Sequence, residues 1–88
     1  MNYDKAQAEW IKIHNLKRGD KVLVFCKAGE DSGWWASWID EHMDPMVGWV
    51  YEVMNIGHEG QGIHLDGPNN NWWFPFYCLI PKKEVIDE

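Results

Sequence analysis

From Leu16 to Ile80 the chain alternates short apolar segments with segments rich in Gly, Pro, Asn and Asp. Such spacing is typical of short strands joined by turns. Strands are predicted over residues 21–27, 47–56, 63–65 and 72–76, and a 3-10 turn over residues 77–80 leads into a short last strand. With room for one domain in 88 residues, this pattern predicts a small, mainly β barrel or sandwich.

A short helix is predicted over residues 3–14, ahead of the strands. Ala6, Trp10 and Ile13 lie near one stripe that Tyr3 extends, so the helix is expected to dock through Trp10. Its N-terminal cap would be Asn2 or Asp4.

The first strand, residues 21–27, is apolar on both faces. One face is therefore expected to line the interior and the other to be covered by the N-terminal helix. Residues 28–46 form a long connection, with a helical turn predicted over residues 34–42 ahead of Pro45.

Seven Trp residues are more than so small a core needs. Clustered exposed aromatic side chains mark interaction sites. We therefore predict one aromatic groove between the long connection and the last hairpin. Such a groove would grip a proline-rich peptide, stack a nucleobase or cage a methylated ammonium, and the alternative is that the rings belong to the core. The candidate ligand-binding residues are Trp34, Trp35, Trp38, Trp49, His64, Trp72, Trp73 and Tyr77.

A net charge of −6 disfavours double-stranded nucleic acid, whose binding needs clustered cations. The N-terminus lacks a signal peptide and no apolar run is long enough for a membrane helix, so a cytoplasmic location is expected. Cys26 and Cys78 are then free thiols, expected to behave as small buried hydrophobes. In a barrel their sulfurs would lie near each other.

Catalysis and metal binding have weak support. None of the four His residues, at 14, 42, 58 and 64, sits in a Cys–His signature, and no Cys-x-x-Cys or His-x-x-x-His spacing occurs. The acidic residues around His42 fit a solvated face better than a cation site. His64, on an outward position beside the groove, would donate to a phosphate or a carbonyl. We predict no enzyme activity, no catalytic residue, no metal and no cofactor.

A set of local motifs is spread from Ala6 to Ile80. The motifs are Leu16, Gly19-Asp20-Lys21-Val22, Gly33-Trp34, Ser37-Trp38, Met43-Asp44, Val47-Gly48, Gly62-Ile63, Leu65 and Trp73-Phe74-Pro75-Phe76. Together they resemble small accessory proteins of bacteriophage genomes that have an SH3-like barrel. The sequence departs from that pattern at Trp35-Ala36, in the tip of the long loop.

The resemblance implies a five-stranded SH3-like barrel with a short N-terminal helix. Residues 1–15 would be the helix, 16–81 the barrel and 82–88 a charged tail. By analogy the protein would act in the host cytosol, as an accessory or counter-defence protein.

Three functions follow as hypotheses. A non-enzymatic module that binds a host or phage protein ranks first, because the negative charge repels anionic ligands. A sponge that sequesters a nucleotide-type signal, with pockets formed in a homo-oligomer, ranks second. A structural accessory protein is the third.

Overall fold

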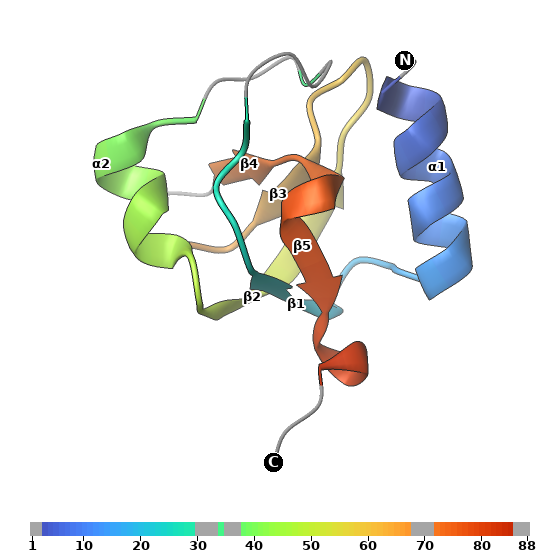
Figure 1. The fold of residues 1–88 in the computed structure, drawn as a ribbon. Coiled ribbons are helices and arrows are strands. Elements are labelled where there is room, and N and C mark those ends of the chain that lie inside the picture. Colours follow the sequence, from blue (N-terminus) through green and yellow to red (C-terminus); the bar gives the residue numbers. More distant parts are fainter. Residues whose placement is uncertain (1–2, 30–33, 35–37, 68–71, 86–88) are drawn as a thin grey trace.

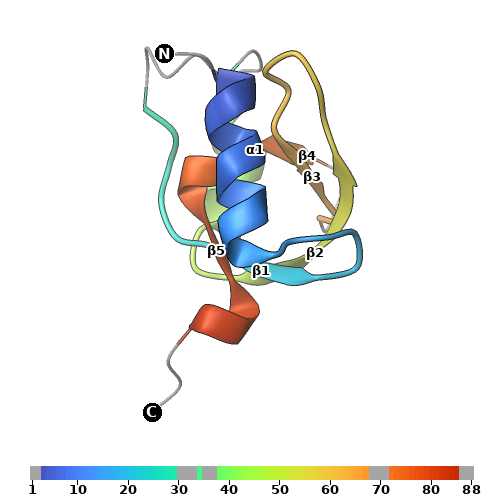
Figure 2. The same cartoon turned by 90° about the vertical axis from the view of Figure 1, so that its right-hand side faces the viewer.

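The computed structural model describes residues 3–29, 34, 38–67 and 72–85 of the chain. The strands are β1 (Lys21–Val24), β2 (Val50–Ile56), β3 (Ile63–Leu65), β4 (Trp72–Phe74) and β5 (Leu79–Pro81). The helices are α1 (Tyr3–His14) and α2 (Asp40–Met43), and the 3-10 helices are η1 (Asp44–Met46), η2 (Phe76–Cys78) and η3 (Lys82–Glu84). α1 and α2 lie on opposite sides of the strands (Figure 1 and Figure 2).

The strands form one antiparallel sheet in the order β4-β3-β2-β1-β5. β2 pairs with β1 along its first half and with β3 along its second half. A register shift between Val53 and Asn55 marks a bulge in β2, which increases the local twist. Within the described residues no ladder joins β4 to β5, so these two strands are the edges of the sheet. The fold is therefore mainly β, with the expected five strands and short N-terminal helix.

The core lies on the inner face of the sheet, where alternate strand residues meet. Met43 and Met46, from α2 and η1, close one side of it, and their flexible side chains suit an irregular gap. The buried cluster consists of Leu16, Val22, Val24, Met43, Met46, Val53, Ile63, Leu65, Phe74 and Leu79.

Helix α1 has the predicted bounds but presents a different face. Tyr3 and Gln7 are its buried residues, and Trp10 packs against Phe76 with 5.8 Å between ring centroids. Ile13, predicted to lie on the packing stripe, is 77% exposed. That part of the prediction is wrong, because the buried positions follow the i, i+4 row through Tyr3 and Gln7.

Three hydrogen bonds fix where α1 lies. The phenol oxygen of Tyr3 accepts from the backbone N–H of Phe76, and the carboxylate of Asp4 accepts from the backbone N–H of Gly60. The amide of Gln7 donates to the carbonyl of Gly57. α1 therefore lies across η2 and the turn between β2 and β3. We had expected α1 to cover the outer face of the first strand, and it does not.

Several element ends differ from the sequence prediction. β1 ends at Val24, although the N–H of Phe25 still donates to the carbonyl of Cys78. β4 ends before Pro75, which has no N–H to give to a ladder. β2 begins at Val50, after Gly48 with its positive φ of 96°.

The helical turn of the long connection, predicted over residues 34–42, occurs as α2 over Asp40–Met43. β3 has the predicted bounds, Ile63–Leu65. Part of the predicted charged tail forms the 3-10 helix η3.

Candidate functional site

The described members of the predicted aromatic groove lie in four separate places on the molecule. Trp72 belongs to β4, Trp38 meets Phe74 of that strand, and Trp34 lies beside Gly62 at the start of β3. Trp73 and His64 lie on the other side of the β3–β4 hairpin. Trp49 precedes β2, and Tyr77 is in η2. Trp35 lies outside the described residues. The structure therefore brings together parts of the predicted set and distributes the rest.

Trp34 and Trp38 attach the long connection to the sheet. The indole N–H of Trp34 donates to the carbonyl of Gln61 at 2.8 Å, and that of Trp38 donates to the carboxylate of Asp44 at 2.6 Å. The ring of Trp38 meets Phe74 edge-on, with 5.5 Å between centroids. Both Trp residues are half-buried and pack against the core cluster. They therefore help to close the core at this edge of the sheet.

Trp72 points toward the inner side of β4, opposite Leu65 of β3. Its ring stacks on the imidazole of His42 at 5.1 Å, with 17° between the planes. His42 belongs to α2, so this stack connects α2 to the edge strand. Neither ring of the pair is fully buried.

Trp73 and His64 form a second stack, on the outward side of β3 and β4. The two residues are cross-strand partners, and their rings lie 4.6 Å apart with 13° between the planes. Gly57 makes room for this ring, because a Cβ there would lie 2.6 Å from Trp73. His64 has the predicted outward direction; Trp73 covers a face of its ring, and its Nδ1 is buried and makes no hydrogen bond with the described residues.

Trp49 and Tyr77 differ from the stacked residues. Trp49 is 66% exposed and is not among the residues that pack against the core cluster. Tyr77 is half-buried and meets the ring of Phe76 edge-on. Phe76 in turn contacts Trp10 and Tyr3 of α1, so Tyr77 belongs to the junction between α1 and η2.

A row of apolar side chains that sequence reasoning did not assign crosses the outer face of β2, β1 and β5. Leu23 lies opposite Val50 on one side and opposite Ile80 on the other. Its chain neighbours are fully buried, so alternation along the strand directs the row away from the core. Val50 is 37% exposed, and Phe25, two residues beyond Leu23, is 45% exposed.

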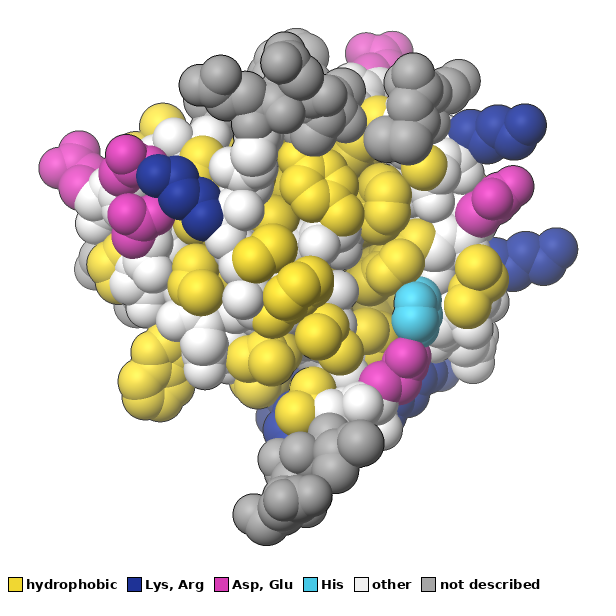
Figure 3. All heavy atoms as spheres, in the orientation of Figure 1, with side chains coloured by type: hydrophobic (Ala, Val, Ile, Leu, Met, Phe, Trp, Pro, Cys, Tyr) yellow, Lys and Arg dark blue, Asp and Glu magenta, His cyan; other side chains and the backbone are white. Residues whose placement is uncertain are grey.

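We call Leu23, Phe25, Val50 and Ile80 the outer apolar row. Figure 3 shows hydrophobic side chains gathered on the face that carries β5. The signal in the sequence was the unbroken apolar segment over residues 22–26, which we had expected α1 to cover.

Charged groups follow the row along the chain, beginning with Lys27, two residues after Phe25. The ammonium of Lys27 lies 2.7 Å from a carboxylate oxygen of Asp40 and 3.9 Å from one of Asp44. The hydrogen bond to Asp40 is the main cause that raises the pKa of Lys27. An apolar centre with a charged border is the usual composition of a protein-binding surface.

Cys26 and Cys78 lie close together, because β1 pairs with β5 and the N–H of Phe25 donates to the carbonyl of Cys78. Cys78 is buried, and burial raises the pKa of its thiol, with a further increase from the neighbouring Cys26. Cys26 is half-buried, and its sulfur lies 4.0 Å from the carbonyl oxygen of Tyr77. Both cysteines are free thiols.

Nothing in the described part of the chain forms a cluster of three or more metal-ligating side chains. Among the described helices, none has both the length and the apolar character needed to cross a membrane. Three His residues have aromatic or acidic partners: His42 with Trp72, His64 with Trp73, and His14 with Glu84.

Comparisons of the chain with protein-family models, with curated proteins and with solved structures give no match.

Proposed function

We propose that this chain is a non-enzymatic binding module with an SH3-like barrel, which docks on another protein. Three features support the SH3-like comparison: the β2-β3-β4 meander, the long connection between β1 and β2, and η2 immediately before β5. The pairing of β1 with β5 also supports it, because the first and last strands adjoin. Closure of the sheet into a barrel is part of the proposal.

The outer apolar row is the observation that supports protein binding. It combines an exposed aromatic ring, Phe25, with three aliphatic side chains held in register by β2, β1 and β5. Burying apolar surface of this kind contributes about 25 cal/mol per Å². The sheet beneath the row already holds these side chains in place, so less conformational entropy is lost when the interface forms.

The charge of the chain indicates the chemistry of the partner. The net charge is −6, and the carboxylates of Asp40 and Asp44 share Lys27, which follows Phe25 of the row by two residues. The complementary surface is an apolar segment flanked by basic residues, which opposite charges would steer into place. The resemblance to phage accessory proteins supports a host or phage protein as the partner.

The test compares two exposed apolar side chains on different faces. Immobilised wild-type protein captures partners from a lysate, and the captured protein is purified and titrated by calorimetry. We expect Phe25→Ser to weaken binding at least about tenfold, the loss typical of an interface hot spot. Ile13→Ser, at a 77% exposed site on α1, should change the dissociation constant less than about twofold.

Three results would count against the proposal. Equal binding by the wild type, the Phe25→Ser variant and a Leu23→Ser variant would exclude the outer apolar row. A dimer of this chain that Phe25→Ser dissociates, seen by sedimentation, would make a second copy the occupant. A nucleotide released intact when the purified protein is heated would favour the sponge.

A further inference from the structure

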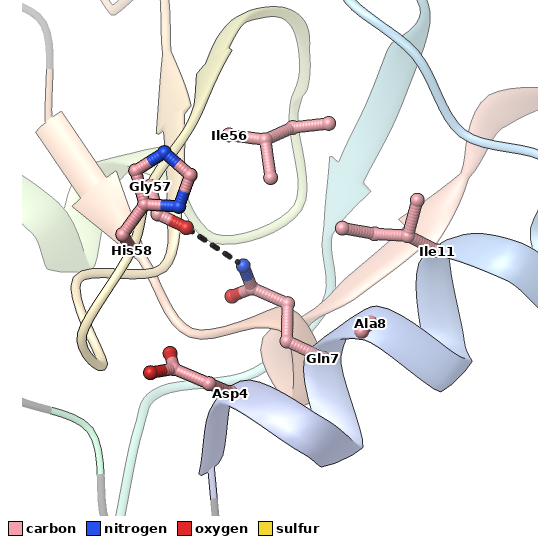
Figure 4. Close-up of a pocket in the computed structure, with 7 residues that line it drawn as sticks. All are labelled: Asp4, Gln7, Ala8, Ile11, Ile56, Gly57 and His58. Atoms are coloured by element: carbon pink, nitrogen blue, oxygen red, sulfur yellow. Dashed lines mark hydrogen bonds between the residues drawn. The ribbon is translucent and has the colours of Figure 1, made fainter.

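A hollow of about 240 Å³ lies between α1 and the end of β2, away from the outer apolar row (Figure 4). One side is apolar, formed by Ala8 and Ile11 of α1 and by Ile56 of β2. The other side carries hydrogen-bonding groups from Asp4, Gln7, Gly57 and His58. The hollow therefore has both a wall for an alkyl chain and a polar end.

Gln7 is the informative residue of the polar end. It is 4% exposed, and its Nε2 donates to the carbonyl of Gly57 at 3.3 Å. Its Oε1 is buried and accepts no hydrogen bond from the described residues. Figure 4 shows this oxygen on the side of the amide that faces Asp4, whereas the amide nitrogen faces Gly57. A buried acceptor without a donor destabilises the fold, so the position favours a ligand that donates.

Asp4 gives the polar end a negative charge. One of its carboxylate oxygens accepts from the backbone N–H of Gly60 at 2.7 Å. A carboxylate offers about four acceptor positions, so this bond leaves capacity for further donors. Hydrogen bonds that involve an ion are roughly twice as strong as neutral ones. The position therefore favours a cationic donor over a neutral one.

We propose that this hollow binds an alkylammonium group. Its three N–H donors would serve the Oε1 of Gln7, the carboxylate of Asp4 and the carbonyl of Gly57. The alkyl chain would lie along Ile11 and Ile56. His58 has an exposed side chain, so it can move to open the way to the buried Oε1 of Gln7 while Asp4 keeps its bond to Gly60. This site is independent of the outer apolar row.

Two sources supply this chemistry, a lysine side chain and a free diamine. The probes are Nα-acetyl-lysine methylamide and putrescine, each titrated into the isotope-labelled protein and followed by NMR. Nα-acetyl-norleucine methylamide, which keeps the alkyl chain and lacks the ammonium, is the control ligand. We expect the lysine probe or putrescine to shift the side-chain amide of Gln7 and the backbone amide of Gly60. The tighter of the two identifies the source.

A matched pair of variants tests the role of the charge. Asp4→Asn keeps an acceptor for Gly60 and removes the charge, so we expect about a tenfold loss of affinity. Glu9→Gln removes the same charge from an exposed position on α1 that does not line the hollow, and should change affinity less than about twofold.

Three outcomes would overturn the site. The first is that neither ammonium probe shifts the Gln7 and Gly60 signals. The second is that the norleucine control shifts these signals as much as the ammonium probes do. The third is an equal loss of affinity in the Asp4→Asn and Glu9→Gln variants, which would reduce the effect to net charge. The wild-type titration decides the first two without any variant that must fold.

Discussion

The phenol oxygen of Tyr3 accepts a hydrogen bond of 3.0 Å from the backbone N–H of Phe76, and the two rings lie 5.2 Å apart. This contact joins the first helix to the segment before the last strand. Tyr3→Phe should lower the free energy of unfolding by about 1–3 kcal/mol, because it leaves that N–H without its acceptor. Urea denaturation measures the change. Ile13→Ala, on the exposed side of α1, should change it by less than about 0.5 kcal/mol, and equal effects of the two substitutions would contradict the prediction.

Stability should fall at alkaline pH. Burial raises the pKa of Tyr3 and of Cys78 in the folded protein. Each group is neutral when protonated, and burial favours the neutral form. Its contribution to the free energy of unfolding is therefore complete below its pKa in the unfolded chain, which is about 8.5 for Cys and about 10 for Tyr. That contribution is lost as the pH rises from this value toward the pKa in the folded protein. Urea denaturation between neutral pH and about pH 10.5 should show this loss, up to about 1.4 kcal/mol per pH unit for each group. A stability that stays constant over this range would refute it, and Tyr3→Phe should reduce the slope above about pH 10.

Gly62 and Gly48 allow a matched test of close packing. Both have a positive φ, 103° and 96°, that a residue with a Cβ adopts with strain. A Cβ at Gly62 would lie 2.3 Å from the carbonyl oxygen of Phe74, whereas one at Gly48 meets nothing within 4 Å.

Gly48→Ala should therefore lower the free energy of unfolding by about 1–2 kcal/mol. Gly62→Ala should lower it by about 1–3 kcal/mol more, because β4 must shift. Thermal or urea denaturation of both variants gives the difference. Equal losses would mean that β4 moves without penalty.

The two thiols should react at very different rates. Cys26 is half-buried, whereas Cys78 is fully buried with a raised pKa, and the thiolate is the reactive form. Iodoacetamide at neutral pH should modify Cys26 first, as peptide mass spectrometry can show. Both sites should react alike in urea. Faster labelling of Cys78 in the folded protein would contradict its buried position.

Local sequence signals predicted most of the secondary structure. Gly62 before β3 and Gly67 after it delimit a strand whose bounds were predicted correctly. The ends of β1 and β2 were less certain, because hydrogen bonds to distant segments determine them. Phe25 illustrates this limit: it continues the apolar pattern of β1, but its exposed position results from where α1 docks.

The candidate sites were harder to predict, because they depend on which side chains meet. Composition indicated a surplus of indole rings, but not that Trp38 would bond to Asp44 or that Trp73 would stack on His64. Gln7 gave no signal at all, since a polar helical residue is expected to face solvent. It is buried because α1 is rotated relative to the stripe that its apolar residues suggest.

The pairing of β1 with β5 also constrains the order of events during synthesis. Leu23 cannot meet Ile80 until the ribosome has released the segment that follows η2, and α1 must wait for Phe76 before it can dock. The first strand would therefore stay unpaired on one edge until residues 79–81 have left the ribosome. Contacts between residues so distant in sequence slow folding, so assembly should be sensitive to chaperones that shield exposed strand edges.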